Sequence, residues 1–424
     1  MNLSDWHESE WYTARHALFS GGNQVTLLTG GDQLFPAMRA AIEGARHEVW
    51  LATYIFHDDA SAEAIAATLV AAARRGVGVG VVVDGFGSKA TLPTLRRWFD
   101  GSGVALAAFR PLDRWYAWLQ PGQYRRLHQK MMAVDGELAF VGGINIIDDR
   151  NDLNHGASAE PRLDFAVELS GPVVAAVAQT ARAMWTRAAV GRDWRDEVRV
   201  LAKSAEPLAR ARELVQQLRV ATPPEEGAGA DMTPVRAAFL VRDNLRQRRA
   251  IERNYIDALG RARTRIDIVS SYFYPGRLFR RTLRAAAQRG VRVRLLLQGK
   301  LDYRFAGLAA SVLYDELLAR GINIYEYTPA FLHAKVALVD DDWATVGSSN
   351  IDPLSLLLNL EANVVVRDAA FTAALAEAIE RAIAVSREVT APAAARGWVK
   401  SLRRGFVAWA ANWYLRLAGI TGRY

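Results

Sequence analysis

Residues 128–135 of this chain read HQKMMAVD, and residues 333–340 read HAKVALVD. In both stretches a lysine follows the histidine by two positions and an aspartate follows it by seven. Each stretch is followed by a glycine-containing segment, GGIN at 142–145 and GSSN at 347–350, which places an asparagine seventeen residues after the histidine. Because every spacing recurs in the second copy, an internal duplication explains them better than chance does.

The duplication extends to a pair of segments upstream of the two histidines. Residues 72–85 read AARRGVGVGVVVDG, and residues 286–299 read AAQRGVRVRLLLQG. Each begins as a helical pattern, reaches a glycine at a C-cap position and continues as an apolar strand. Strand–helix alternation of this kind predicts an α/β fold of two duplicated sandwich domains with largely parallel sheets.

The same patterns predict individual elements. We expect helices at residues 35–44, 62–75, 251–261 and 278–289, and strands at 47–57, 77–83, 265–274 and 291–297. A length of 424 residues is enough for two domains. We divide the chain into an N-terminal extension (1–21), a first domain (22–200), a linker (201–235), a second domain (236–390) and a basic amphipathic helix (391–424).

Composition narrows the class of protein. The net charge of +8 favours an anionic partner, either a membrane surface or a nucleic acid. The absence of cysteine excludes disulfides, thiolate catalysis and cysteine–zinc sites. The best candidate for a membrane span, residues 173–185, is too short and carries Gln179 and Arg182. Since the N-terminus also shows no secretory signal, we expect a cytosolic or membrane-peripheral protein.

The spacing within each motif has a physical consequence. Residues two positions apart project from the same face of a strand, so each histidine points into one site together with its lysine. The aspartate, Asp135 in one copy and Asp340 in the other, has the opposite parity and sits at a turn. We therefore expect it to brace the loop rather than to contact substrate.

A site assembled from both copies would hold two imidazoles, two ammonium groups and two carboxamides. The side chains expected to bind the non-bridging oxygens of a phosphate are Lys130, Asn145, Lys335 and Asn350. One histidine can attack phosphorus while the other protonates the leaving oxygen. Because the lysines supply the positive charge, we predict neither a metal nor an organic cofactor.

The paired pattern resembles the phospholipase D superfamily, in which two HxKxxxxD motifs meet at a pseudo-twofold domain interface. The resemblance covers about residues 22–390 and is greatest to the B-type bacterial cardiolipin synthases, through YIF at 54–56, DGFG at 84–87 and GSSNID at 347–352. It implies the catalytic set His128, Lys130, Asp135, His333, Lys335 and Asp340. By the family's precedent, His128 is the nucleophile and His333 the general acid.

The resemblance also implies a reaction and a location. Two phosphatidylglycerol molecules would give cardiolipin and glycerol through a phosphohistidine intermediate. The enzyme would be peripheral, at the cytoplasmic face of the bacterial inner membrane, with phosphatidylglycerol and an anionic membrane surface as its partners.

An acidic residue downstream of each motif is further implied, as a hydrogen-bond partner of the catalytic histidine. The matching positions are Asp164, in RLDF, and Glu361, in NLEAN. Alternatively, Asp164 caps backbone N–H groups or forms an ion pair with Arg162. Ala52 departs from the pattern, because related sequences tend to carry an acid at this strand position.

Two segments indicate lipid contact. Residues 396–424 contain six basic residues and no acid, with tryptophans at helical spacing. This pattern is typical of a helix on an anionic membrane, and the alternative is a helix docked on the protein core. The segment WYAW at 115–118 either lies at the mouth of the site or belongs to the core.

Other functions use the same motif. A hydrolytic phospholipase D and a phosphodiesterase or nuclease are the alternatives to transfer, and the basic charge fits a nuclease. We expect no nucleic-acid partner, because the sequence has no helix-turn-helix, zinc-finger or RNP signature. A non-catalytic scaffold is disfavoured because both motifs are intact. The oligomeric state is not predicted, since one chain completes the site.

Overall fold

The structure is a computed structural model. It describes residues 17–111, 125–152, 156–203, 235–243, 247–299, 313–352 and 359–390, with only the backbone for 190–203. The expected basic helix, most of the expected linker and the WYAW segment lie outside these ranges. The predictions about them therefore stay predictions.

Each half of the chain forms one sheet. The first has the order β1 (Gln24–Thr29), β9 (Phe165–Ser170), β6 (Leu138–Gly142), β5 (Met131–Val134), β2 (Glu48–Thr53), β3 (Gly78–Asp84), β4 (Ala105–Phe109). The second has the order β10 (Arg236–Arg242), β16 (Glu361–Arg367), β15 (Trp343–Gly347), β14 (Lys335–Val339), β11 (Arg265–Ser270), β12 (Arg292–Gln298), β13 (Asn323–Tyr327), β17 (Arg387–Glu388). Apart from β17 the two orders match strand by strand, so the predicted duplication is present in the topology. A separate ribbon pairs β7 (Asn151–Asp152) with β8 (Gly156–Ala157).

The sheets are mixed, and the expectation of largely parallel sheets is wrong. In the first sheet β2, β3 and β4 pair in parallel, whereas the other neighbours are antiparallel. The second sheet repeats this division. The reason lies in the motifs themselves. The strand that carries each motif ends in a tight turn at Asp135 or Asp340, and a turn this short joins only antiparallel neighbours. Both aspartates have φ of 52°, in the left-handed region.

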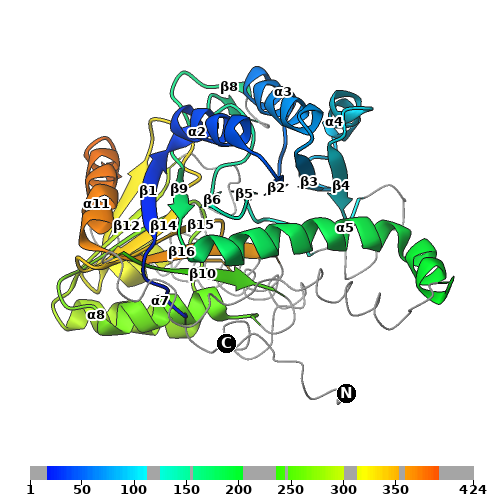
Figure 1. The fold of residues 1–424 in the computed structure, drawn as a ribbon. Helices are drawn as coiled ribbons and strands as arrows, with labels where there is room; N and C mark the ends of the chain where they lie inside the picture. The colour runs from blue at the N-terminus through cyan, green and yellow to red at the C-terminus, as the bar shows by residue number, and fades with distance from the viewer. Residues whose placement is uncertain are drawn as a thin grey trace, which may run out of the picture.

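Helices cover the outer face of each sheet (Figure 1). The first sheet carries α2 (Gly30–Gly44), α3 (Ala60–Arg74) and α4 (Leu92–Phe99), and the second carries α7 (Ala250–Arg261) and α8 (Arg277–Gln288). Two further helices, α5 (Val173–Lys203) and α11 (Ala369–Ala384), contribute to one core cluster that contains residues of both halves. The two sheets are therefore held together by a shared apolar core.

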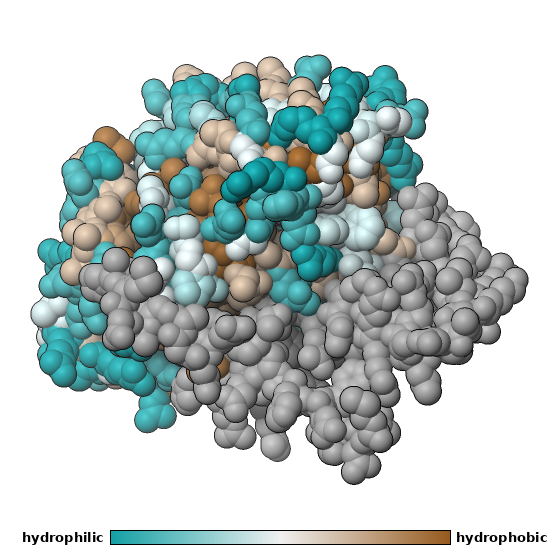
Figure 2. All heavy atoms as spheres, viewed as in Figure 1, coloured by the Kyte–Doolittle hydropathy of each residue, from teal (hydrophilic) through white to brown (hydrophobic). Residues whose placement is uncertain are grey.

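The expected helices and strands are present, with shifted ends. Helix α2 begins at Gly30, earlier than expected, where Asp149 accepts a hydrogen bond of 2.5 Å from the Gly31 N–H. The strands expected to reach residues 57 and 274 end at Thr53 and Ser270. Among the described residues, none of the helices combines the length and the apolar content of a membrane span. The surface over α2, α3 and α4 is mainly hydrophilic in the view of Figure 2.

The two halves meet at the approach to each motif. Leu127, just before His128, forms a bridge with Leu360 of the second half. Leu332, just before His333, forms a bridge with Leu163 of the first half. This reciprocal exchange is a pseudo-twofold arrangement, and it brings the two motifs to one interface.

Candidate active site

Backbone hydrogen bonds fix both histidines at the domain interface. The His128 N–H donates to the Leu360 carbonyl at 3.0 Å, and the His333 N–H donates to the Leu163 carbonyl at 2.9 Å. The residue that follows Leu360 is Glu361, and the residue that follows Leu163 is Asp164. Each histidine is thus held beside an acid of the other half.

The side-chain hydrogen bonds cross the interface in the same way. His128 Nδ1 lies 2.9 Å from Glu361 Oε2, and His333 Nδ1 lies 2.6 Å from Asp164 Oδ2. Both carboxylates predicted as histidine partners therefore contact a histidine, but each one serves the motif of the opposite half. Each motif histidine is thus paired with a carboxylate from the other half and not with the predicted acid of its own half.

The first pair favours a neutral imidazole. Burial lowers the pKa of His128, although Glu361 opposes this shift. Burial alone would raise the pKa of Glu361, but contact with His128, the Lys130 charge and a hydrogen bond from Ser348 hold it below its usual range. The pair is therefore an ionised Glu361 and a neutral His128 that donates its Nδ1–H. This arrangement leaves the Nε2 lone pair of His128 available for attack.

The second pair holds a proton more readily. Burial raises the pKa of Asp164 to about 7. Burial, followed by the nearby Lys335 charge, holds the pKa of His333 well below its usual range. The pair as a unit thus takes up one proton near neutral pH, between two atoms 2.6 Å apart. The two halves of the site are chemically unequal.

The two lysines are buried cations. Lys130 and Lys335 are 4% and 1% exposed. The ammonium of Lys130 donates to the carbonyl of His128 at 2.8 Å, and that of Lys335 donates to the carbonyl of His333. Burial lowers the pKa of Lys130 to about 7 and that of Lys335 to about 8. A bound phosphate anion would favour their charged forms.

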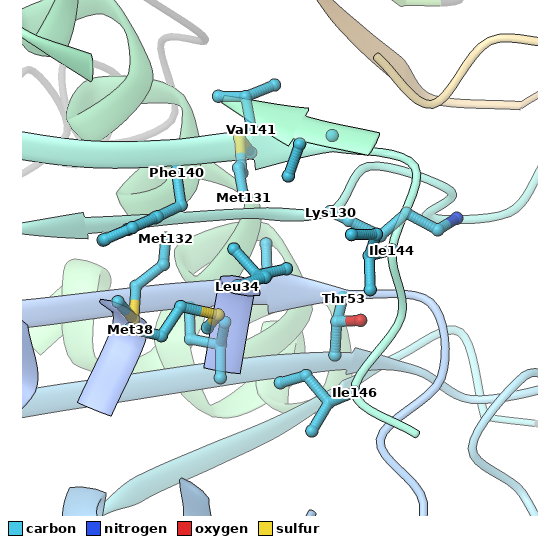
Figure 3. A pocket seen from close by; sticks show the side chains of 14 residues that line it. Leu34, Met38, Thr53, Lys130, Met131, Met132, Phe140, Val141, Ile144 and Ile146 are labelled. Carbon is cyan, nitrogen blue, oxygen red and sulfur yellow. The ribbon is translucent and has the colours of Figure 1, made fainter. Parts of the chain in front are cut away.

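A small apolar cavity lies behind Lys130 (Figure 3). Its volume is about 20 Å³, and its walls include Met38, Met132 and Phe140. Figure 3 shows the Lys130 ammonium pointing away from the methionines. The cavity is thus part of the low-dielectric surroundings of the lysine stem rather than a ligand site.

The two asparagines are buried near the motifs. The Asn145 Oδ1 accepts the Ile55 N–H at 3.1 Å, which leaves its amide N–H groups for other acceptors. The corresponding Oδ1 of Asn350 is buried and has no hydrogen-bond partner among the described residues. Asn145 and Asn350 are 3% and 7% exposed, so a phosphate oxygen reaching either amide would bind away from bulk water.

The motif aspartates lie at the opposite end of the motif strands from the histidines. Asp135 accepts hydrogen bonds of 2.8 Å from the backbone N–H groups of Arg46, His47 and Glu48. Asp340 accepts from the backbone N–H groups of residues 263, 264 and 265. These contacts tie the hairpin turn to the start of the neighbouring strand and support the bracing role expected from the parity.

Sequence reasoning missed several residues around the histidines. Asp84 Oδ2 accepts the Leu127 N–H at 2.8 Å, and Gln298 Oε1 accepts the Leu332 N–H at 3.2 Å. Both therefore position the residue that precedes a motif histidine. Their equivalence was visible as the paired turns DG at 84–85 and QG at 298–299. Ala52 is fully buried in the shared core, where an acid would need a hydrogen-bond partner.

No group of three or more histidine, aspartate or glutamate side chains that could hold a metal ion occurs among the described residues. What the interface does bring together is two histidine–acid pairs and two lysines, drawn from both halves. This set can supply a nucleophile, a proton donor and positive charge to a single phosphodiester.

Comparison with known proteins identifies the family. Residues 38–160 and 255–383 each match the family model described as "Cardiolipin synthase, PLD-like domain", so both motifs are covered. The chain belongs to this family. It is 35% identical to cardiolipin synthase B of Escherichia coli over 86% of this chain and 81% of that protein. It is also 32% identical to cardiolipin synthase A of Pseudomonas putida over 91% of this chain and 74% of that protein.

Two solved structures share the fold of this family member. Phosphatidylserine synthase of Haemophilus influenzae superposes with a TM-score of 0.61 at 12% identity, covering 94% of each chain. Polyphosphate kinase of Porphyromonas gingivalis superposes with a TM-score of 0.51 at 16% identity, covering 84% of this chain and 46% of the kinase. The two-domain phospholipase D-like architecture predicted from the motifs is confirmed.

Proposed function

We propose that this protein is a cardiolipin synthase that transfers a phosphatidyl group from one phosphatidylglycerol to another. The observation that carries the proposal is the crossed pairing of two histidines with two buried carboxylates beside two lysines. Membership of the cardiolipin synthase family supports the lipid substrate.

The first half-reaction forms a covalent intermediate. The Nε2 of His128 attacks the phosphorus of the donor lipid, and the bond from phosphorus to the glycerol oxygen breaks. The proton held by the Asp164–His333 pair goes to that oxygen, so free glycerol leaves. Lys130 and Lys335 stabilise the negative charge on the non-bridging oxygens.

The second half-reaction reverses these roles. A hydroxyl of the acceptor phosphatidylglycerol gives its proton to His333 and attacks phosphorus, and the bond to His128 breaks. The assignment of His128 as nucleophile rests on its neutral state beside ionised Glu361. The assignment of His333 as acid and base rests on the proton that its pair with Asp164 takes up.

Location follows from the substrate. A phospholipid substrate requires the enzyme to meet a bilayer, and we propose peripheral binding at the cytoplasmic face of the inner membrane through the basic residues 396–424. Deletion of these residues should weaken binding to anionic vesicles without lowering the melting temperature. A sharp fall in melting temperature would instead favour docking on the protein core.

The reaction is tested by incubating the purified chain with phosphatidylglycerol vesicles and identifying every product. Cardiolipin and free glycerol in equal amounts are expected, and excess glycerol should drive the reaction backwards. Phosphatidic acid as the main product would establish a hydrolytic phospholipase D instead. Cleavage of DNA at matched salt, without lipid turnover, would establish a nuclease.

A further inference from the structure

Tyr54 is one of the positions at which the pseudo-twofold symmetry of the site breaks. Lys335 pairs with Ser270 in the sheet, and the register of the first sheet sets Lys130 opposite Thr53 in the same way. Thr53 Oγ1 donates to the carbonyl two residues ahead at 3.0 Å, and Ser270 Oγ does the same at 2.7 Å. The residue after Thr53 is Tyr54, and the residue after Ser270 is Ser271. These two residues therefore occupy equivalent positions, each directly after the strand residue that lies opposite a motif lysine.

On the first side the tyrosine ring covers the motif. Its centroid lies 5.0 Å from that of the His128 imidazole and 5.3 Å from the Lys130 ammonium. The side chain of His128 is consequently only 13% exposed. The ring shields the proposed nucleophile from water and adds a cation–π contact to Lys130.

On the second side this cover is missing. Within the described residues no aromatic ring packs on His333 or Lys335, and the His333 side chain is 26% exposed, twice the value for His128. In the part of the chain that the structure describes, the buried hydroxyl oxygen of Ser271 has no hydrogen-bond partner. A buried hydroxyl without a hydrogen-bond partner is energetically unfavourable, and a polar ligand that bonds to it removes this cost.

The geometry of the displacement at phosphorus indicates which group binds beside His333. In an in-line displacement the attacking alcohol approaches phosphorus from the side opposite His128, which is the side of His333. Both the departing and the incoming hydroxyl must therefore lie beside His333. A glycerol head group carries further hydroxyls that can both donate to and accept from a serine.

We propose that the glycerol head group of the lipid substrate binds over His333, in the place that Tyr54 fills in the other half, with Ser271 as its hydrogen-bond partner. This subsite rests on the function proposed above and explains how the enzyme favours a lipid alcohol over water. The departing glycerol of the donor and the head group of the acceptor occupy it in turn.

The test uses the ratio of cardiolipin to phosphatidic acid formed on phosphatidylglycerol vesicles. Both products arise from the same phosphohistidine, so their ratio reports the acceptor step and is independent of the rate of the first step. Ser271→Ala should lower the ratio about tenfold, as expected when one buried hydrogen bond is lost. Ser271→Tyr, which copies Tyr54, should lower it further because the ring fills the subsite.

Tyr54→Phe is the matched control, since it keeps the ring over His128 and should leave the ratio unchanged. Melting temperatures establish that each variant folds. An unchanged ratio in both folded Ser271 variants would overturn the subsite, even if total turnover falls. Failure of the wild-type chain to make any cardiolipin would overturn the proposed function itself, which is a different outcome.

Discussion

Gly143 is the glycine on which the Asp164–His333 pair depends. A Cβ added at Gly143 would lie 2.2 Å from Asp164 Oδ1 and 2.9 Å from its Cγ. Asp164 is only 1% exposed, so it has no free space into which to move. Gly143→Ala should therefore displace the carboxylate from His333. The equivalent residue of the second half is Ser348, whose hydroxyl instead donates to Glu361 at 2.6 Å.

The expected loss can be estimated from the role of the pair. Positioned acid–base catalysis contributes about 10²–10⁴-fold to a rate, so Gly143→Ala should lower turnover on phosphatidylglycerol vesicles by roughly 10²-fold or more. Overpacking should also cost about 1–3 kcal/mol of stability, which a urea titration measures. Gly260→Ala is the matched control, because no atom lies within 4 Å of its added Cβ. Wild-type turnover in a folded Gly143→Ala variant would show that the position of the Asp164 carboxylate is not needed for catalysis.

Further predictions concern stability and pH. Asp267→Ala should lower the free energy of unfolding by about 2 kcal/mol in the same urea titration, since it removes two hydrogen bonds from Arg294, which is 7% exposed and keeps its pair with Glu380. Glu377→Ala, in an exposed pair, should change the free energy of unfolding by under about 0.5 kcal/mol. Asp135→Ala should lower the melting temperature, because three backbone N–H groups lose their acceptor, while turnover of the folded enzyme persists. Abolished turnover at unchanged stability would contradict the role of Asp135 in bracing the hairpin turn. The pH profile of kcat/KM should fall above about pH 7 as Lys130 loses its proton, and a plateau to pH 9 would contradict this.

Much of the fold was predictable because the duplication repeats local signals. Gly76 and Gly290 mark the ends of two equivalent helices, and both adopt positive φ. Strand direction was not predictable from apolar runs, because such runs look alike in parallel and antiparallel pairs. The turns at Asp135 and Asp340 carried that information, since a turn this short requires an antiparallel hairpin.

The site was predictable as a set of residues but not as a set of pairs. The motif spacing located both histidines and lysines, and the resemblance located Asp164 and Glu361. That each acid contacts the histidine of the other half depends on the domain interface, which leaves no trace in the local sequence. The replacement of Tyr54 by Ser271 was equally hidden, because the two positions become equivalent only through the sheet register.

The most direct test of the account is the identity of the covalent intermediate. Wild-type enzyme turning over phosphatidylglycerol is quenched, digested and analysed by mass spectrometry for peptides that carry a phosphatidyl group. A single site with unequal halves gives at most one such group per chain, on the peptide that contains His128, and none in the His128→Ala variant. A phosphatidyl group on His333, or on both histidines of one chain, would contradict a single site with unequal halves.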